Sequence, residues 1–91
     1  MLPFEEKQIS ETIKIRTFKQ STLSEELIWH RDAEDRSVRV LKGEGWYFQR
    51  DNDLPDLMMP NKVYFIKKCT WHRVIRQKDC SELVVEITKL L

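Results

Sequence analysis

A chain of 91 residues has room for one domain with one core, and 41% of its residues are hydrophobic, too many for a disordered chain. Charged residues make up 34%, but they nearly cancel to a net charge of +1 and the basic residues form no run. This balance argues against a nucleic-acid partner and against attraction to an anionic membrane.

The sequence gives no sign of membrane insertion or secretion. No apolar stretch approaches the ~18–20 residues of a membrane span, and the first residues lack the basic start and apolar centre of a signal peptide. We therefore expect a cytoplasmic protein with free thiols. Cys69 and Cys80 fit this view, because about ten residues of an extended hairpin separate them by ~30 Å, and a disulfide needs Cα atoms within about 7 Å.

The N-terminal half begins irregularly and then takes the period of a strand. Residues 1–11 are predicted to form an arm, and residues 12–91 a β-barrel. Ile and basic residues alternate over 13–16, which is typical of a half-buried strand. Residues 27–32 are predicted to be extended, and the β-branched stretch 37–41 forms the next strand.

The C-terminal half continues the pattern of short strands. Strands are predicted over the aromatic stretch 46–49, then over 63–66, 70–76 and 83–88, the last with the cleanest alternation in the chain. Turn signals separate them at 43–45, 51–53 and 77–81. Seven or eight strands at this spacing predict an all-β sandwich or barrel, with helix limited to a turn or two.

Two histidines and one aspartate form a candidate metal site. His30 and Asp32 stand at positions i and i+2 of an extended segment, so their side chains point to the same face about 6.5–7 Å apart. His72 lies on another predicted strand and supplies a third ligand if the two sheets face one another. This ligand set is typical of non-haem Fe(II), and Mn, Ni and Zn accept similar ligands. His-x-Asp also occurs by chance, and His30 is then a partly buried strand histidine unrelated to His72.

The stretch from His30 resembles the first motif of the cupin family, which reads His-x-His, three or four residues, Glu, six residues, Gly. His30 and Gly43 match that motif, Asp32 stands at the second histidine, and Ser37 falls at the glutamate. Residues 40–45, Val-Leu-Lys-Gly-Glu-Gly, are also similar to the cupin sequence at this point. Loss of the glutamate leaves three protein ligands where such a cupin has four.

The second cupin motif, Pro-x-Gly-x-x-His-x-x-x-Asn, is matched at His72 and departs at Lys67, Cys69 and Arg76. The resemblance covers roughly residues 27–88 and extends faintly to small cupin-like proteins of marine phages. It implies a cupin-like double-stranded β-helix, a small antiparallel barrel or jelly roll with a metal cavity, in a chain that forms a homodimer.

Two arginines are candidates for substrate binding. Arg39 lies two residues beyond Ser37 in the cupin motif, and Arg76 has the parity of the motif histidine, so both could hold a carboxylate or phosphate. The apolar pair Val38 and Val40 predicts instead that Arg39 points outward. Arg76 lies near a turn, where solvent is the simpler partner.

Three kinds of function remain open on the sequence alone. The first is a metal-dependent enzyme of the oxygenase or isomerase type that acts on a small, anionic molecule, with iron as the first choice of metal. The second is a non-catalytic module that binds a small molecule and has lost the metal site. The third is a structural or assembly protein that works through a large apolar interface.

Overall fold

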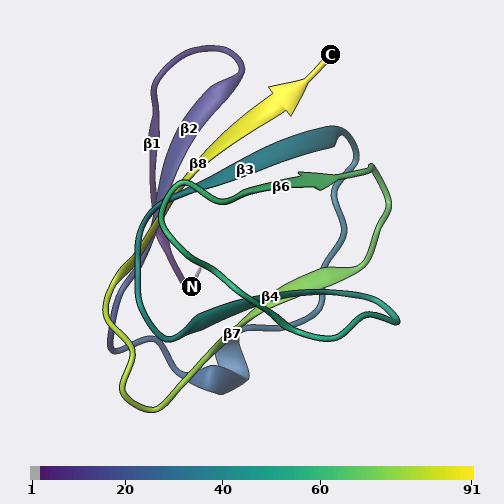
Figure 1. Ribbon diagram of the computed structural model, residues 1–91. Helices are drawn as coiled ribbons and strands as arrows, with labels where there is room; N and C mark the ends of the chain where they lie inside the picture. Colours follow the sequence, from purple (N-terminus) through teal and green to yellow (C-terminus); the bar gives the residue numbers. More distant parts are fainter. Residues whose placement is uncertain (1–2) are drawn as a thin grey trace.

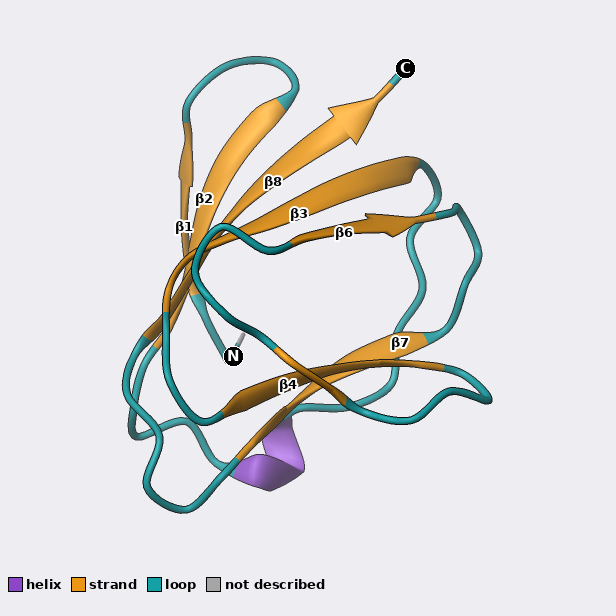
Figure 2. Cartoon of the chain, viewed as in Figure 1, coloured by secondary structure: helices purple, strands orange, loops and turns teal. Residues whose placement is uncertain are grey.

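The structure is a computed structural model that describes residues 3–91, and within them the chain folds into two facing antiparallel sheets (Figure 1). The larger sheet has the order β1-β2-β8-β3-β6 and the smaller one β5-β4-β7. The elements are β1 (Glu5–Gln8), β2 (Ile13–Phe18), the 3-10 turn η1 (Ser24–Glu26), β3 (Asp35–Lys42), β4 (Trp46–Arg50), β5 (Asp56–Leu57), β6 (Val63–Ile66), β7 (His72–Arg76) and β8 (Leu83–Leu90). This double-sheet arrangement confirms the predicted all-β jelly-roll class (Figure 2).

The N-terminal arm differs from its prediction, because residues 5–8 form strand β1 at the edge of the larger sheet. Its sequence has no apolar alternation, and every one of its residues is exposed. Cross-strand ion pairs stabilise it instead: the Glu6 carboxylate accepts hydrogen bonds from Nε and Nη2 of Arg16 on β2, at 2.9 and 2.8 Å. The predicted extended segment 27–32 is likewise reduced to a single bridge at His30.

Strand β2 turns its basic residues toward the space between the sheets. In its register with β8, Arg16 lies opposite Val85 and Phe18 opposite Leu83, and residues paired in this way share one face of the sheet. Phe18, Val85 and Leu83 are all buried. The alternation over 13–16 is therefore real, but its basic half lies inside and Ile15 lies on the outer face.

The core fills the space between the sheets, and one of its members, Phe48, lies beside the ring of His72. Trp46 and Val40 are fully buried there, and the Trp46 indole donates a hydrogen bond of 2.7 Å to the carbonyl of Ser81. Cys69 is exposed and Cys80 is buried, and both are free thiols, as expected. Across residues 3–91, no helix has the length and apolar character needed to cross a membrane.

Candidate functional site

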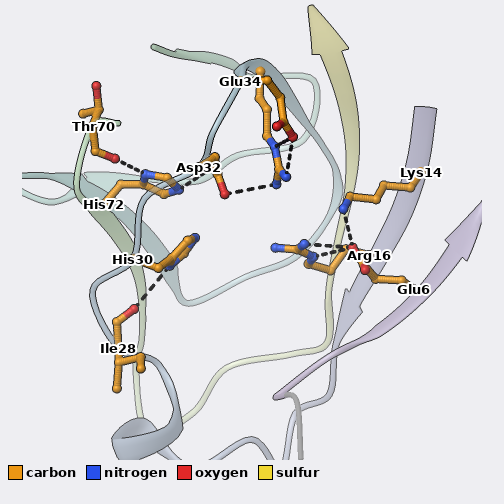
Figure 3. Close-up of polar contacts among 10 residues, drawn as sticks. Glu6, Lys14, Arg16, Ile28, His30, Asp32, Glu34, Thr70 and His72 are labelled. Atoms are coloured by element: carbon orange, nitrogen blue, oxygen red, sulfur yellow. Dashed lines mark hydrogen bonds and ion pairs between the residues drawn. The ribbon is translucent and has the colours of Figure 1, made fainter. Parts of the chain in front are cut away.

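The structure brings together the three residues of the candidate metal site. One nitrogen from each of His30 and His72 and one carboxylate oxygen of Asp32 all lie within 4.8 Å of one another. Figure 3 shows these side chains turned toward a common point, while Arg16 reaches toward the same space from β2. Ligand atoms this close can converge on one metal ion at ~2.0–2.2 Å from each.

Backbone hydrogen bonds place these residues. His30 and His72 form an antiparallel bridge, with N–H to carbonyl distances of 2.9 and 2.8 Å, so their side chains emerge on one face. The rings consequently meet edge to face with centroids 4.2 Å apart. The amide of Cys69 donates to the carbonyl of Asp32 at 2.7 Å, which holds the i+2 position on that face. The single bridge is thus the element that assembles the cluster.

Both imidazoles are oriented by backbone carbonyls. Nδ1 of His72 lies 2.8 Å from the carbonyl of Thr70, and Nδ1 of His30 lies 3.3 Å from the carbonyl of Ile28. A carbonyl only accepts, so each Nδ1 carries a proton, and Nε2 is the atom through which each ring would bind a metal. Metal-binding histidines are commonly oriented in this way. The donor set therefore fits a divalent transition metal, with two Nε2 atoms and one carboxylate.

Asp32 joins the histidines to an arginine. Its carboxylate lies 3.3 Å from Nε2 of His72 and 3.3 Å from Nη1 of Arg36, and its side chain is 11% exposed. Burial by itself raises the pKa of Asp32, but the His72 contact and the Arg36 charge outweigh it and the pKa is lowered. Burial and the neighbouring His72 lower the pKa of His30. Both shifts favour the protonation states that bind a metal, an ionised carboxylate and a neutral imidazole.

A cavity of about 440 Å³ opens beside the cluster. Its walls are mostly apolar and come from both sheets, and its polar lining consists of Arg16, Glu26, His30, Asp32, Arg36 and His72. The apolar lining includes Phe18, Val38, Phe48, Met58, Val74 and Ile87. Small-molecule sites commonly combine such walls with a few convergent polar groups.

The structure places neither predicted substrate-binding arginine in this cavity. Arg39 lies on the outer face of β3, exposed and 3.5 Å from Glu86, as the alternation of the neighbouring valines predicts. Arg76 points inward, but at the far end of β7, where its guanidinium donates to the carbonyl of Thr22 at 2.7 Å and to Sγ of Cys80 at 3.2 Å. Arg76 therefore ties loops together away from the cluster.

The arginines that do line the cavity are Arg16 and Arg36, and neither was predicted from the sequence. Ser37 pairs with Phe65 of β6 and faces outward, so it cannot stand at the inward glutamate position. Arg36 stands there instead, with three residues between it and Asp32 and six between it and Gly43, a spacing that the cupin motif permits. The motif allows three or four residues between its second histidine and its glutamate. Taking three residues after Asp32 would have pointed to Arg36.

Arg16 is held at the cavity by Glu6 of β1 and by Phe4, which precedes that strand. Its side chain is 12% exposed, its guanidinium carbon lies 3.8 Å from the centre of the Phe4 ring, and it pairs with Glu6. Partial burial by itself raises the pKa of Glu6, but the hydrogen bonds and charges of Arg16 and Lys14 lower it overall. Strand β1 thus fixes a cation over the cavity.

Comparisons with known proteins support this architecture at the level of structure. No protein-family model and no curated protein matches the sequence. Among solved structures, a cupin domain from Bordetella pertussis has a TM-score of 0.62 at 18% identity, and the match covers 97% of this chain and 92% of that one. The chain has the cupin fold.

Other cupin-fold structures are larger than this chain. A cupin-like protein from Thermotoga maritima has a TM-score of 0.66 at 19% identity, and the match covers 85% of this chain and 55% of that protein. Fe(II) HppE has a TM-score of 0.67 at 11% identity, with 86% of this chain and 41% of HppE covered. The chain therefore spans only about half of some of its structural neighbours, and likeness at these identities concerns the fold alone.

Proposed function

We propose that this cupin-fold protein binds a divalent transition metal through His30, Asp32 and His72 and holds a small anionic molecule in the adjoining cavity. The observation that carries the proposal is the convergence of three ligand atoms within 4.8 Å, with both Nδ1 atoms bound to carbonyls. Two imidazoles and one carboxylate leave coordination positions free for a substrate. Iron is the first choice, followed by manganese, nickel and zinc, and an enzyme built on this site catalyses an oxidation or an isomerisation.

A second candidate function is a non-catalytic module that binds a small molecule without a metal. The contacts of Asp32 with His72 and Arg36 favour it, because they give this carboxylate partners in the absence of an ion. In that case the cluster serves only to hold the segment around His30 against β7.

Metal content separates the two functions. The protein is stripped with a chelator, refilled with each metal in turn, desalted and analysed for metal by mass spectrometry. We expect about one ion per wild-type chain and a loss of at least ~90% in Asp32→Asn, because the only anionic ligand of the three is removed. Asp51→Asn, at an exposed turn, is the matched control and should retain the wild-type content. Equal metal content in Asp32→Asn and wild type, or none in either, would overturn the proposal.

We also propose that the protein forms a homodimer through the outer face of the larger sheet. A chain of 91 residues buries a limited share of its surface, and β6 presents Val63 and Phe65 on that face at 42% and 68% exposure. Sedimentation velocity tests this proposal: we expect a dimer, and a monomer for Phe65→Glu. A monomeric wild type at micromolar concentration contradicts it.

A further inference from the structure

The inward residue of β3 nearest to the cluster carries a positive charge. Nη1 of Arg36 lies 3.3 Å from the Asp32 carboxylate, while Nε and Nη2 donate to the Glu34 carboxylate at 3.1 and 2.8 Å. The Arg36 side chain is 16% exposed and lines the cavity. A cation therefore occupies the position at which the cupin motif has an acidic residue.

This charge reversal leaves a loaded site short of negative charge. Asp32 is the only anion among the three ligands, so a divalent ion bound there keeps one unneutralised positive charge. Arg36 and Arg16 also line the cavity, but each already has a carboxylate partner, Glu34 for Arg36 and Glu6 for Arg16. An anionic ligand balances the remaining charge of the ion, whereas a neutral one leaves that charge uncompensated in a mostly apolar cavity.

The cavity also restricts the rest of the ligand. The apolar walls include buried Phe18, Phe48 and Ile87, with Val74 partly buried. A polyhydroxylated or multiply charged molecule would leave polar groups without partners against these walls. One anionic head on an aliphatic or aromatic body fits the lining.

We propose that Arg36 is the specificity-determining residue of this site and selects a small monocarboxylate with an apolar body. This inference rests on the proposed function in so far as a metal on Asp32 draws that carboxylate away from Arg36. Nη1 is then free to donate to the carboxylate of the ligand, while Glu34 keeps the guanidinium in place. Arginine suits this role because it stays charged and because Nη1 carries donors that Glu34 does not use.

The test compares carboxylates with their neutral amides. Acetate, 4-methylpentanoate and phenylacetate are titrated by calorimetry into the metal-loaded and the metal-stripped protein, each beside its amide, with inorganic phosphate as an anion without an apolar body. We expect 4-methylpentanoate or phenylacetate to bind the loaded protein at least ~10-fold more tightly than its amide and than phosphate, since a site built for a charged group discriminates against its absence.

Arg36→Gln should abolish this preference, and Arg39→Gln should leave it intact. Arg39 is the matched control because it lies on the same strand, on the outer face, and is also paired with a carboxylate. The comparison of acid with amide in the wild type keeps the test decisive if Arg36→Gln does not fold.

The outcomes of this test are separable from those of the proposed function. If the wild type binds metal but shows no preference for either longer acid over its amide, or if Arg36→Gln keeps the preference, the role of Arg36 is wrong and the metal site stands. Tighter binding of phosphate than of either longer acid also overturns that role. If the wild type binds no metal and still prefers a carboxylate through Arg36, the selection stands and the metal proposal fails.

Discussion

Replacing His72 by alanine should destabilise the metal-free protein, even though His72 is proposed as a ligand. The ring is 5% exposed and packs against Phe48 at 5.8 Å and His30 at 4.2 Å between centroids. Its removal leaves a cavity and takes one partner each from the Thr70 carbonyl and the Asp32 carboxylate. A lost buried polar partner costs about 1–3 kcal/mol, and with the packing loss we expect a fall of about 2–4 kcal/mol in the free energy of unfolding.

The same loss can be expressed as a melting temperature. With about 2.1 cal/mol/K of unfolding entropy per residue, the 91 residues give about 190 cal/mol/K, so 2–4 kcal/mol lowers Tm by about 10–20 °C. Urea unfolding in the presence of a chelator measures this cost directly. Trp71→Ala is the control. The Trp71 side chain is next to His72 in the sequence and 44% exposed, so its removal should cost less than about 1 kcal/mol.

Metal added to the same samples then separates ligation from packing. At a free metal concentration of 100 Kd, binding stabilises the folded protein by about 2.7 kcal/mol, or about 14 °C in Tm. We expect this increment in the wild type and in Trp71→Ala, and its near loss in His72→Ala. A cost below about 1 kcal/mol for His72→Ala in chelator refutes the packing described here, and an equal metal increment in both proteins refutes ligation by His72.

Three further changes test the fold around the cavity by urea unfolding. Glu6→Gln should be less stable than the wild type at pH 7, and the difference should vanish as the pH falls through the lowered pKa of Glu6, because its ionised form is the one favoured by folding. A difference that persists at pH 3 contradicts this pairing. Gly45→Ala should cost at least about 1–3 kcal/mol, since Gly45 has φ of +79° and a new Cβ would lie 3.0 Å from Cα of Cys80; an unchanged midpoint disproves the close approach. Trp46→Phe should cost about 1–3 kcal/mol because the carbonyl of Ser81 loses its indole donor, and a neutral effect would show that water replaces it.

The sequence predicted the parts of this structure that depend on local alternation. Strand β8 follows from its buried Leu83, Val85 and Ile87, which alternate with less buried residues, and the His-x-Asp spacing placed two candidate ligands on one face. Strand β1 was missed because its stability comes from pairing with β2 and from ion pairs such as that of Glu6 with a distant arginine. Such contacts leave no periodic signal in the strand itself.

The direction in which a strand faces was the harder prediction. Apolar and basic residues alternate regularly over 13–16, but an alternation of period two does not indicate which of the two sets is buried. The register with β8 decides it, because placing Phe18 against buried Leu83 also turns Arg16 inward. That cation is tolerated because Glu6 pairs with it across the β1–β2 ladder. Arg36 was missed for a related reason. The cupin motif allows three or four residues after Asp32, and these two spacings select residues on opposite faces of β3.

The two sheets contribute different chemistry to the cavity, and this division constrains the ligand. His72 belongs to the smaller sheet, and the bridge adds His30 to its edge, whereas Arg16 and Arg36 project from the larger sheet. The distance between candidate metal ligands and candidate anion-binding groups is therefore set by the packing between the sheets, chiefly by residues such as Phe48, whose ring contacts both His72 and Tyr64. Since packed cores resist changes of even one methylene, this spacing is rigid. A ligand carboxylate that contacts both the metal site and Arg36 does so without movement of either sheet. A longer spacer between the carboxylate and the apolar body would move the carboxylate away from Arg36.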